Sequence, residues 1–327
     1  HAIASRTHDI MLALVVGAAA LKIAITGSNS GIGLAASRQL LADGHSIIHA
    51  CRSAEAAATA ASAAGGGTPM VCNLADLASV RKFAAELPSD VDVLCLNAGV
   101  SPSRKEEAPT RTVDGFQETW GVNHLAHFLL ASLAQPQLAA NKARLVITAS
   151  GVHDPESPGG LVQNDPATGA TLGDLSGLAA GAAMADGGAY NGAKAYHDSK
   201  LMNVLFCNEA SKRWGGLDVA AFNPGLVTST GLFREAKKDN FIGASIFCFA
   251  AEKIAGFAVP VEVAGERLAY MATSADVKSG EYLSAPSATS KAASKADGFD
   301  VANISKEARD AALAARLWER SAELVGV

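Results

Sequence analysis

Short apolar runs alternate along this chain with longer segments of mixed polarity. The apolar runs have the length of strands and little polar alternation, which indicates strands buried on both faces. We predict them at residues 22–26, 46–51, 70–72, 91–96, 144–149 and 218–223. The intervening segments have the length of helices. We predict helices at residues 32–43, 54–64, 77–86 and 115–135, and one that carries Tyr196 to about residue 214.

Strands that alternate with helices are typical of a parallel sheet with helices on both faces. The sequence therefore predicts an α/β protein with a doubly wound parallel sheet, the Rossmann fold, as a single domain. We place this domain at residues 22–327 and treat residues 1–21 as an N-terminal extension. The apolar stretch at residues 11–21 is either the remnant of a targeting segment or an element that packs on the fold, and we favour the second interpretation.

Two segments interrupt the alternation. Residues 151–188 form a long insertion rich in Gly, Pro, Ala and Asp, and loops of that length are often functional. Residues 230–263, with an apolar run at residues 241–251, are a lid over a pocket, a membrane-surface contact or a core helix; we take the lid as our prediction. Residues 306–327 predict a C-terminal amphipathic helix with apolar positions at Leu313, Leu317, Trp318 and Leu324.

Composition narrows the class of protein. Hydrophobic residues make up 49% of the chain and charged ones 18%, which suits a globular core and argues against disorder. The net charge of −5 implies no basic face, so we expect no nucleic-acid partner. No apolar stretch reaches the ~18–20 residues of a membrane span.

Cysteine and histidine patterns bear on metals and redox compartment. The five cysteines form no C-x-x-C pair, which favours a reducing compartment over a disulfide framework or structural zinc. His124 and His127 lie one helical turn apart, but the sequence offers no third ligand nearby. We therefore predict no metal site.

A glycine-rich turn follows the first predicted strand and opens a helix. Glycines let the backbone approach a pyrophosphate, and the helix N-terminus offers free N–H groups to it. We predict nucleotide contacts at Gly27, Ser30, Gly31, Ile32 and Gly33. After the second strand, where an NAD enzyme commonly places an acidic residue, this chain has Arg52 and Ser53. A guanidinium can pair with a 2′-phosphate, so the cofactor is predicted to be NADPH.

A second group of residues has the chemistry of proton transfer. Tyr196 and Lys200 are four positions apart on one predicted helix and share a face. A nearby ammonium stabilises phenolate, so we expect Lys200 to lower the tyrosine pKa. Ser150 ends a predicted strand, at the edge where α/β folds bind ligands, and its hydroxyl is placed to orient a substrate.

In this combination the chain resembles the short-chain dehydrogenase/reductase superfamily. The motifs that carry the resemblance are T-G-x-x-x-G-x-G at residues 26–33, N-A-G at residues 97–99, Asn123, Ser150, Y-x-x-x-K at residues 196–200, and Pro224-Gly225. The resemblance implies that Tyr196 donates the proton, that Lys200 binds the nicotinamide ribose and tunes Tyr196, and that Asn123 holds a proton-relay water. It also implies cofactor contacts at Asn73, Leu74, Asn97, Ala98, Gly99, Tyr196, Lys200, Pro224, Gly225 and, near the carboxamide, Thr228.

Further segments resemble the light-dependent protochlorophyllide reductase family. They lie at residues 144–147, 153–155, 172–177, 186–188, 192–200, 230–235, 265–269, 279–282 and 311–327, so they include the long insertion. This resemblance implies NADPH, light and reduction of one ring double bond of protochlorophyllide, a tetrapyrrole. It also implies a plastid or the cyanobacterial cytoplasm, with peripheral association at a membrane such as the thylakoid.

The chain departs from that family at three positions. Leu226 follows the Pro-Gly where the family usually has a cysteine implicated in pigment binding and proton delivery, Asn223 replaces a tyrosine, and Met202 replaces a second cysteine. Three interpretations stay open: a divergent pigment reductase, a light-independent reductase of a hydrophobic carbonyl or alcohol, and a non-catalytic nucleotide-binding subunit of a photosynthetic complex. Association into a homo-oligomer through helices is a further expectation.

Overall fold

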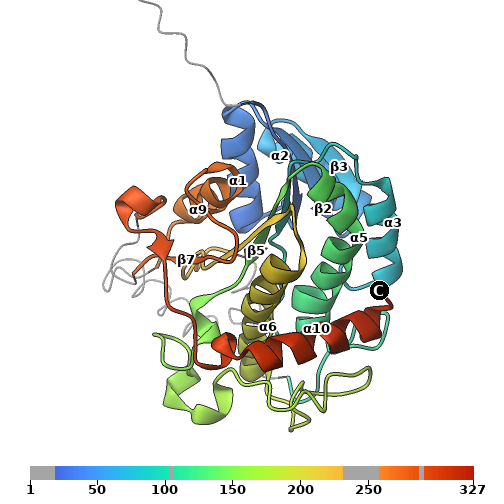
Figure 1. Cartoon of the computed structure of the whole chain (residues 1–327), viewed down its shortest axis with the longest axis vertical. Helices are drawn as coiled ribbons and strands as arrows, with labels where there is room; N and C mark the ends of the chain where they lie inside the picture. The colour runs from blue at the N-terminus through green and yellow to red at the C-terminus, as the bar shows by residue number, and fades with distance from the viewer. Residues whose placement is uncertain (1–18, 104–105, 231–257, 287–290) are drawn as a thin grey trace, which may run out of the picture.

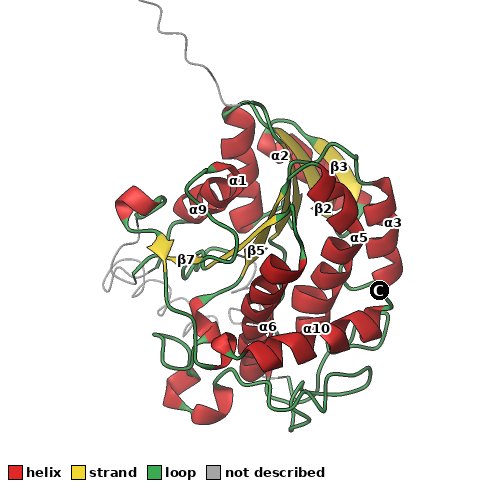
Figure 2. Cartoon of the chain, viewed as in Figure 1, coloured by secondary structure: helices red, strands yellow, loops and turns green. Residues whose placement is uncertain are grey.

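The computed structural model describes residues 19–103, 106–230, 258–286 and 291–327. In these parts of the chain, eight strands form one central sheet, in the order β3-β2-β1-β4-β5-β6-β7-β8 (Figure 1; Figure 2). Their bounds are β1 Lys22–Thr26, β2 Ser46–Cys51, β3 Thr68–Val71, β4 Val93–Leu96, β5 Arg144–Thr148, β6 Asp218–Phe222, β7 Tyr282–Ser284 and β8 Asp300–Val301. Neighbours pair in parallel up to β7, and β7 pairs antiparallel with β8. The predicted doubly wound sheet is confirmed, except that its last strand runs the other way.

Helices cover both faces of the sheet (Figure 1). The principal helices are α1 Gly31–Ala42, α2 Ala54–Ala64, α3 Leu77–Glu86, α5 Ala126–Ala140, α6 Gly192–Arg213, α9 Val261–Thr273 and α10 Ala311–Val325. Alternate residues of β1 face opposite layers: Ile23 and Ile25 pack in the core under α1 and α9, whereas Ala24 packs in the core under α3, α5 and α6. The fully apolar strand sequences predicted from the chain follow from this burial on both sides.

Several helix boundaries follow from capping residues. Ser53 begins α2 by accepting a hydrogen bond from the Ala56 N–H at 3.2 Å, and Gly65 ends it in a left-handed conformation with φ of +89°. Asp76 begins α3 by accepting from the Ala78 N–H at 2.9 Å. Both helices have the predicted bounds because these local signals are visible in the sequence.

The helix predicted at residues 115–135 is different in the structure. It begins as the short α4 (Glu118–Trp120), passes through a π-helical turn at Gly121–Leu125 and continues as α5 to Ala140. Such turns are rare and often occur at functional sites. Asn123 lies within this one, so its backbone does not have ordinary α-helical hydrogen bonding.

The insertion and the C-terminus pack together on α6. Residues 151–188 contain three short 3₁₀ turns and bury apolar side chains such as Leu172 and Leu178. Helix α10 crosses α6 and α5 (Figure 1), where Leu313 and Leu317 are buried and Trp318 lies edge-on to Trp214, with 5.0 Å between ring centroids. The predicted C-terminal helix is therefore present. It begins at Ala311 rather than residue 306 because Asp310 caps it through the Ala312 and Leu313 N–H groups.

Parts of the remaining predictions lie outside the described residues. This holds for residues 1–18 of the N-terminal extension and for the apolar run at residues 241–251. At the end of the predicted lid, residues 261–263 form the first turn of α9, which packs closely on α1, and the lid itself stays a prediction. Among the helices that are described, none combines the length and apolar character needed to span a bilayer.

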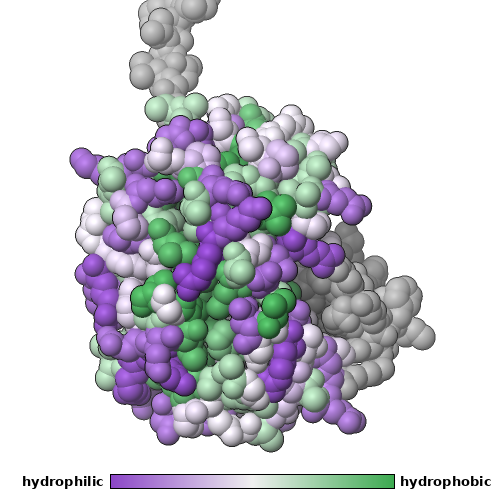
Figure 3. Space-filling view, turned by 90° about the vertical axis from the view of Figure 1, so that its right-hand side faces the viewer, coloured by the Kyte–Doolittle hydropathy of each residue, from purple (hydrophilic) through white to green (hydrophobic). Residues whose placement is uncertain are grey.

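One face of the molecule mixes apolar and charged side chains. Figure 3 shows green hydrophobic residues gathered near its centre, with purple hydrophilic residues around and between them. Among the described large apolar side chains, Val71, Val113, Leu133, Val301 and Val327 are the exposed ones. Scattered exposure of this kind is normal for a protein surface, and the predicted homo-oligomer stays a prediction.

Candidate active site

The turn between β1 and α1 is packed closely around its glycines. Gly27 and Gly31 have φ of +68° and +54°, which side chains rarely adopt. A Cβ on Gly33 would lie 2.7 Å from the Gly27 carbonyl oxygen and 2.8 Å from Asn97 Nδ2, closer than packing allows. Ser30 begins α1 without capping it through its side chain. The first N–H groups of α1 therefore stay available to an anion, which fits a dinucleotide pyrophosphate.

Residues at the end of β2 flank this turn. Arg52 is exposed and, among the described residues, makes no hydrogen bond or ion pair. The Ser53 hydroxyl oxygen accepts from the Ala56 N–H, so its own proton stays free to donate. Beneath the turn, the buried Ser28 hydroxyl lies 3.0 Å from His49 Nδ1 and ties the turn to β2. This arrangement suits a phosphate held at Arg52 and Ser53.

Thr26 joins the ends of β1 and β4. Its hydroxyl oxygen accepts from the N–H groups of Asn97 and Ala98 at 2.8 and 3.0 Å, and Asn97 Nδ2 donates to the Thr26 carbonyl at 3.0 Å. A Cβ on Gly99 would lie 3.4 Å from Asn123 Oδ1 and 3.7 Å from Lys200 Nζ. The N-A-G segment thus connects the glycine turn to the residues predicted to be catalytic.

The structure brings Ser150, Tyr196 and Lys200 together. The Ser150 side chain lies close enough to the Tyr196 phenol to oppose the rise in its pKa that burial causes. Lys200 Nζ lies 5.5 Å from the centroid of the Tyr196 ring and donates to the Thr148 carbonyl at 3.2 Å. Ser150 lies two residues after the end of β5, and the other two residues lie on one face of α6. A phenol, an ammonium and a hydroxyl are therefore grouped at the edge of the sheet that also holds the glycine turn.

Burial controls the protonation of this group. It raises the pKa of Tyr196, against a smaller lowering by the Ser150 side chain, and it lowers the pKa of Lys200 to about 8. Our expectation that Lys200 lowers the tyrosine pKa is wrong for the protein alone, because loss of water around the phenol has the larger effect. Both pKa shifts favour the neutral form, of the Tyr196 phenol and of the Lys200 amine.

Asn123 joins three segments through its side chain. Its Oδ1 accepts from the Val100 N–H at 2.8 Å, and its Nδ2 donates to the Val100 carbonyl and to the Ser199 hydroxyl at 2.9 and 3.0 Å. Its carbonyl oxygen lies 3.1 Å from His127 Nδ1. The side chain therefore holds the segment after β4 against α6, and the predicted relay water stays a prediction.

The Pro-Gly turn after β6 is shaped by its neighbours. Gly225 has φ of +90°, its N–H donates to Asn223 Oδ1 at 3.0 Å, and the buried Arg267 donates to the Pro224 carbonyl at 2.7 Å. Asn223 Nδ2 also lies 3.3 Å from where a Cβ on Gly151 would be. Asn223, which replaces the family's tyrosine, therefore lies beside the segment that follows Ser150.

Other predicted positions are less central. Leu226 is partly buried beside Ala258, Thr228 is buried, and Met202 lies wholly in the core under α6. A cysteine in place of Met202 would therefore be buried in the core of this chain. After β3, the Asn73 side chain accepts from the Ala75 N–H at 3.2 Å and Leu74 is buried. Whether these two contact a cofactor stays a prediction.

The two histidines weighed as metal ligands have other partners. His127 Nε2 lies 3.0 Å from the Thr26 hydroxyl, and His124 Nε2 lies 2.9 Å from the Ser321 hydroxyl. Burial lowers the pKa of each, to about 4 for His127 and about 3 for His124, so both are neutral near pH 7. Their place in the described structure is that of hydrogen-bonded core residues.

A buried ion cluster fastens the insertion to α6 on both sides of Tyr196. Lys194 Nζ lies 2.7 Å from Asp198 Oδ2 and 3.0 Å from Asp186 Oδ2, and it donates to the Thr171 carbonyl at 2.6 Å. Asp198 Oδ1 accepts from the Thr171 N–H at 2.9 Å. Burial raises the pKa of Asp198 to about 7. The insertion is thus bonded to the helix that carries the predicted catalytic pair.

We expect Asp198→Ala to lower the free energy of unfolding by about 1–3 kcal/mol, because the Thr171 N–H loses its partner and Lys194 loses one of its two carboxylates. Urea denaturation measures this difference. Asp174→Ala, at an exposed carboxylate of the same insertion, is the control and should change the free energy little. Equal losses in the two variants would contradict the role given to the cluster.

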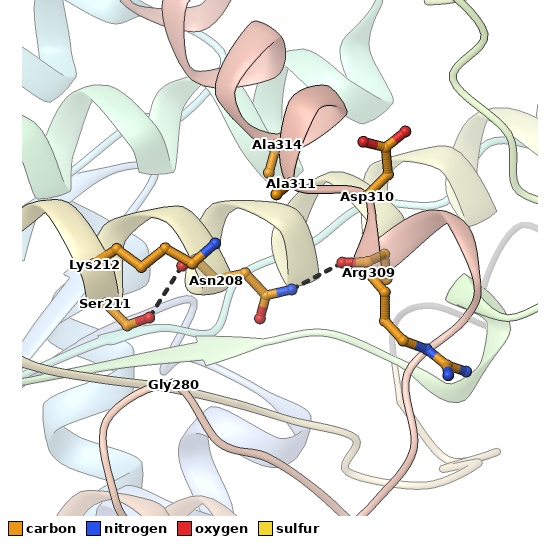
Figure 4. A pocket seen from close by; sticks show the side chains of 9 residues that line it. Asn208, Ser211, Lys212, Gly280, Arg309, Asp310, Ala311 and Ala314 are labelled. Carbon is orange, nitrogen blue, oxygen red and sulfur yellow. Dashed lines mark hydrogen bonds between the residues drawn. The ribbon is translucent and has the colours of Figure 1, made fainter.

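A pocket lies away from this group of residues. It has a volume of about 270 Å³ and is lined by the later turns of α6 and by the segment that begins α10 (Figure 4). Asn208 Nδ2 donates across it to the Ala308 carbonyl at 2.9 Å. It lies toward the opposite end of α6 from Tyr196, so it is separate from the candidate active site.

Sequence patterns assigned no role in the site to some of the residues around it. Thr26, His127, His153 and Ser199 each hydrogen-bond to a predicted site residue or its neighbour. Each also lies within four positions of a motif, and three of them are buried polar side chains within helices or turns. A search for polar residues at helical spacing from the motifs would have found His127, whereas the contacts of His153 require the folded structure.

Comparison with known proteins gives a consistent set of similarities. Residues 22–162 match the family model described as short chain dehydrogenase. The chain is 38% identical to a protochlorophyllide reductase, chloroplastic, of Pisum sativum, over 93% of this chain and 78% of that protein. It is also 38% identical to protochlorophyllide reductase B, chloroplastic, of Hordeum vulgare, with the same coverage. A crystal structure of an uncharacterised protein from Mycobacterium paratuberculosis superposes with a TM-score of 0.68 at 27% identity, covering 94% of each chain.

Proposed function

We propose that this chain, which belongs to the short-chain dehydrogenase/reductase family and resembles the protochlorophyllide reductases within it, reduces a ring double bond of protochlorophyllide with NADPH and light. Membership of the family makes the chain an NAD(P)H-dependent oxidoreductase that acts on a small molecule. The tetrapyrrole substrate, the choice of NADPH and the need for light are the proposal. The match to relatives over 93% of the chain, insertion included, supports the pigment as substrate.

The observation that carries the proposal is the grouping of Ser150, Tyr196 and Lys200, with Lys200 Nζ 5.5 Å from the centroid of the Tyr196 ring. These groups lie at the sheet edge that holds the glycine turn, as a reductase requires. NADPH, when bound there, would supply the hydride. The Tyr196 hydroxyl would then give its proton to the reduced substrate, and its high pKa in the buried site keeps that proton in place until negative charge develops nearby.

The other residues of the site would bind the cofactor and orient the substrate. Lys200 would bind the nicotinamide ribose and stabilise the phenolate that proton transfer leaves, since its ammonium lies over the Tyr196 ring. Ser150 would orient the substrate and the phenol. The first N–H groups of α1 would bind the pyrophosphate. Gly33 lets the turn pack closely against the Gly27 carbonyl and Asn97.

Arg52 at the end of β2 supports NADPH over NADH as the cofactor. Removing the Arg52 guanidinium by Arg52→Ala should weaken NADPH binding about 10- to 100-fold, because a charge-assisted hydrogen bond contributes roughly 1.5–3 kcal/mol. NADH binding should hardly change, because NADH has no 2′-phosphate. Fluorescence titration of both nucleotides measures the two constants.

Arg38→Ala is the matched control, since Arg38 is an exposed arginine of α1 that donates to the Ala63 carbonyl instead. It should leave both constants nearly unchanged. Equal weakening of NADPH and NADH by Arg52→Ala would refute a 2′-phosphate contact at this residue.

A light-independent reductase of a hydrophobic carbonyl or alcohol is the second candidate. Leu226 favours it, because leucine cannot deliver a proton where the pigment reductases usually have a cysteine. In this case Tyr196 would protonate a carbonyl oxygen while Ser150 held it. The names of the relatives favour the pigment, so we place this function second.

Location and association are also proposed from the relatives. Those of pea and barley carry the word chloroplastic in their names, which supports a plastid for this chain. Cyanobacterial cytoplasm, peripheral association with the thylakoid or another complex, and a homo-oligomer stay predictions from the resemblance.

One experiment separates the two functions. Purified protein is mixed with NADPH and protochlorophyllide, and absorbance is compared in darkness and after a flash. The pigment function predicts a red shift to the chlorophyllide band only after the flash. No pigment binding and no shift, together with turnover of an aldehyde or ketone in darkness, would establish the second function instead.

A further inference from the structure

The main chain leaves the sheet just before Ser150, the residue whose hydroxyl contacts Tyr196. The last hydrogen bond to the neighbouring strand is from the Ala149 N–H to the Phe222 carbonyl at 2.9 Å. Beyond it, the Ser150 carbonyl accepts from the side chain of His153 at 2.8 Å and from its main-chain N–H at 3.3 Å. The sheet therefore fixes the main chain at Ala149, and His153 fixes it at Ser150.

The His153 ring is held from both sides. Its side chain is buried, and the Ser305 N–H donates to Nε2 at 3.2 Å. Because a main-chain N–H only donates, Nε2 must be the acceptor, and because a carbonyl only accepts, Nδ1 must carry the proton. The ring is therefore neutral, in one tautomer, and burial lowers its pKa in agreement. Tyr282 packs edge-on against it, with 5.0 Å between centroids.

Ser305 belongs to a segment that also binds the insertion and α6. Glu307 accepts from the Leu172 N–H at 2.7 Å, Asn208 donates to the Ala308 carbonyl at 2.9 Å, and Arg320 donates to the Leu178 carbonyl at 2.9 Å. The C-terminal segment is therefore anchored independently of His153. It gives the imidazole a fixed support on the side away from Ser150.

We propose that His153 is a positioning residue for the reaction: its neutral ring, supported by the C-terminal segment, holds the main chain of Ser150 so that the hydroxyl meets the Tyr196 phenol. The reaction itself rests on the proposed function, but the geometry does not. Small displacements of a group that orients reactants reduce rates strongly. A residue that only fills the core would affect stability and not the approach of the Ser150 hydroxyl to the Tyr196 phenol.

Two substitutions separate the two contacts of the ring. In His153→Asn, the amide is short and can donate to the Ser150 carbonyl in place of Nδ1, but it does not reach Ser305. In His153→Gln, the longer amide can accept from the Ser305 N–H in place of Nε2, but it loses the Ser150 contact. We expect product formation after a flash to fall about 10- to 100-fold in His153→Gln and far less in His153→Asn, with NADPH binding unchanged in both.

NMR supplies a readout that needs no substrate. With ¹³Cζ-labelled tyrosine, the Tyr196 signal, assigned with Tyr196→Phe, should move in His153→Gln and stay in place in His153→Asn. In the unsubstituted protein, ¹⁵N-labelled histidine should show His153 protonated at Nδ1. Arg320→Ala, which loosens the C-terminal helix without touching His153, is the control and should lower thermal stability but leave the Tyr196 signal in place.

The outcomes are distinct. The proposal would be overturned if the Asn and Gln variants changed the Tyr196 signal equally. It would also be overturned if the signal moved in proportion to the loss of thermal stability, or if the histidine spectrum placed the His153 proton on Nε2. If the unsubstituted protein leaves protochlorophyllide unreduced, the proposed function fails, while the NMR results still decide the role of His153.

Discussion

Tyr196→Phe should slow turnover about 10²-fold or more while leaving NADPH affinity nearly unchanged. The substitution removes only the hydroxyl that would donate the proton and that lies near the Ser150 side chain. The ring stays to pack under Lys200. Steady-state rates measure the effect on turnover, and quenching or enhancement of nucleotide fluorescence measures the affinity.

The control is Tyr270→Phe, which removes a hydroxyl on α9 that donates to Asp276 at 3.4 Å, away from the site. Its rate should match that of the unsubstituted protein. A Tyr196→Phe protein that retained full turnover would mean that the proton comes from another group, and the role given to this residue would be wrong.

Gly33→Ala should weaken NADPH binding about 10²-fold. The added methyl group would lie 2.7 Å from the Gly27 carbonyl oxygen and 2.8 Å from Asn97 Nδ2, so the turn must move. Displacing backbone groups that bind a phosphate removes several charge-assisted hydrogen bonds together, each worth roughly 1.5–3 kcal/mol. Calorimetric titration of NADPH measures the loss.

Gly44→Ala provides the comparison, because a Cβ at Gly44 meets nothing within 4 Å, although its φ of +89° brings backbone strain. It should lower stability and leave NADPH affinity unchanged. If Gly33→Ala bound NADPH as tightly as the unsubstituted protein, the nucleotide would not sit on this turn.

Local signals explain which parts of the fold could be predicted. Strands β1, β2 and helices α2 and α3 have the predicted bounds because each is a short apolar run or begins at a capping residue such as Ser53 or Asp76. The π-helical turn around Asn123 was missed, because the apolar spacing of this segment fits an ordinary helix. In the structure, Gly121 at its start lies close to Thr112 and Phe116. The antiparallel β8 is too short to show a pattern.

Local signals likewise explain which parts of the candidate site could be predicted from the sequence. Spacing alone placed Tyr196 and Lys200 on one face of a helix, and the strand-end position of Ser150 indicated that it would join them. The pKa of Tyr196 is raised, whereas we expected it to be lowered. The spacing of Tyr196 and Lys200 can be read from the sequence, but the burial that shifts both pKa values cannot. The contact between His153 and Ser305 joins positions far apart in the chain, and no local pattern records it.

A crystal structure with NADP⁺ bound tests the central claim most directly. We predict that the pyrophosphate lies on the turn at residues 27–33, the 2′-phosphate on Arg52, and the nicotinamide ring within contact of the Tyr196 hydroxyl, with Lys200 Nζ bonded to the adjoining ribose. A nucleotide bound elsewhere, or a nicotinamide facing away from Ser150 and Tyr196, would contradict the assignment of this site as the place of hydride and proton transfer.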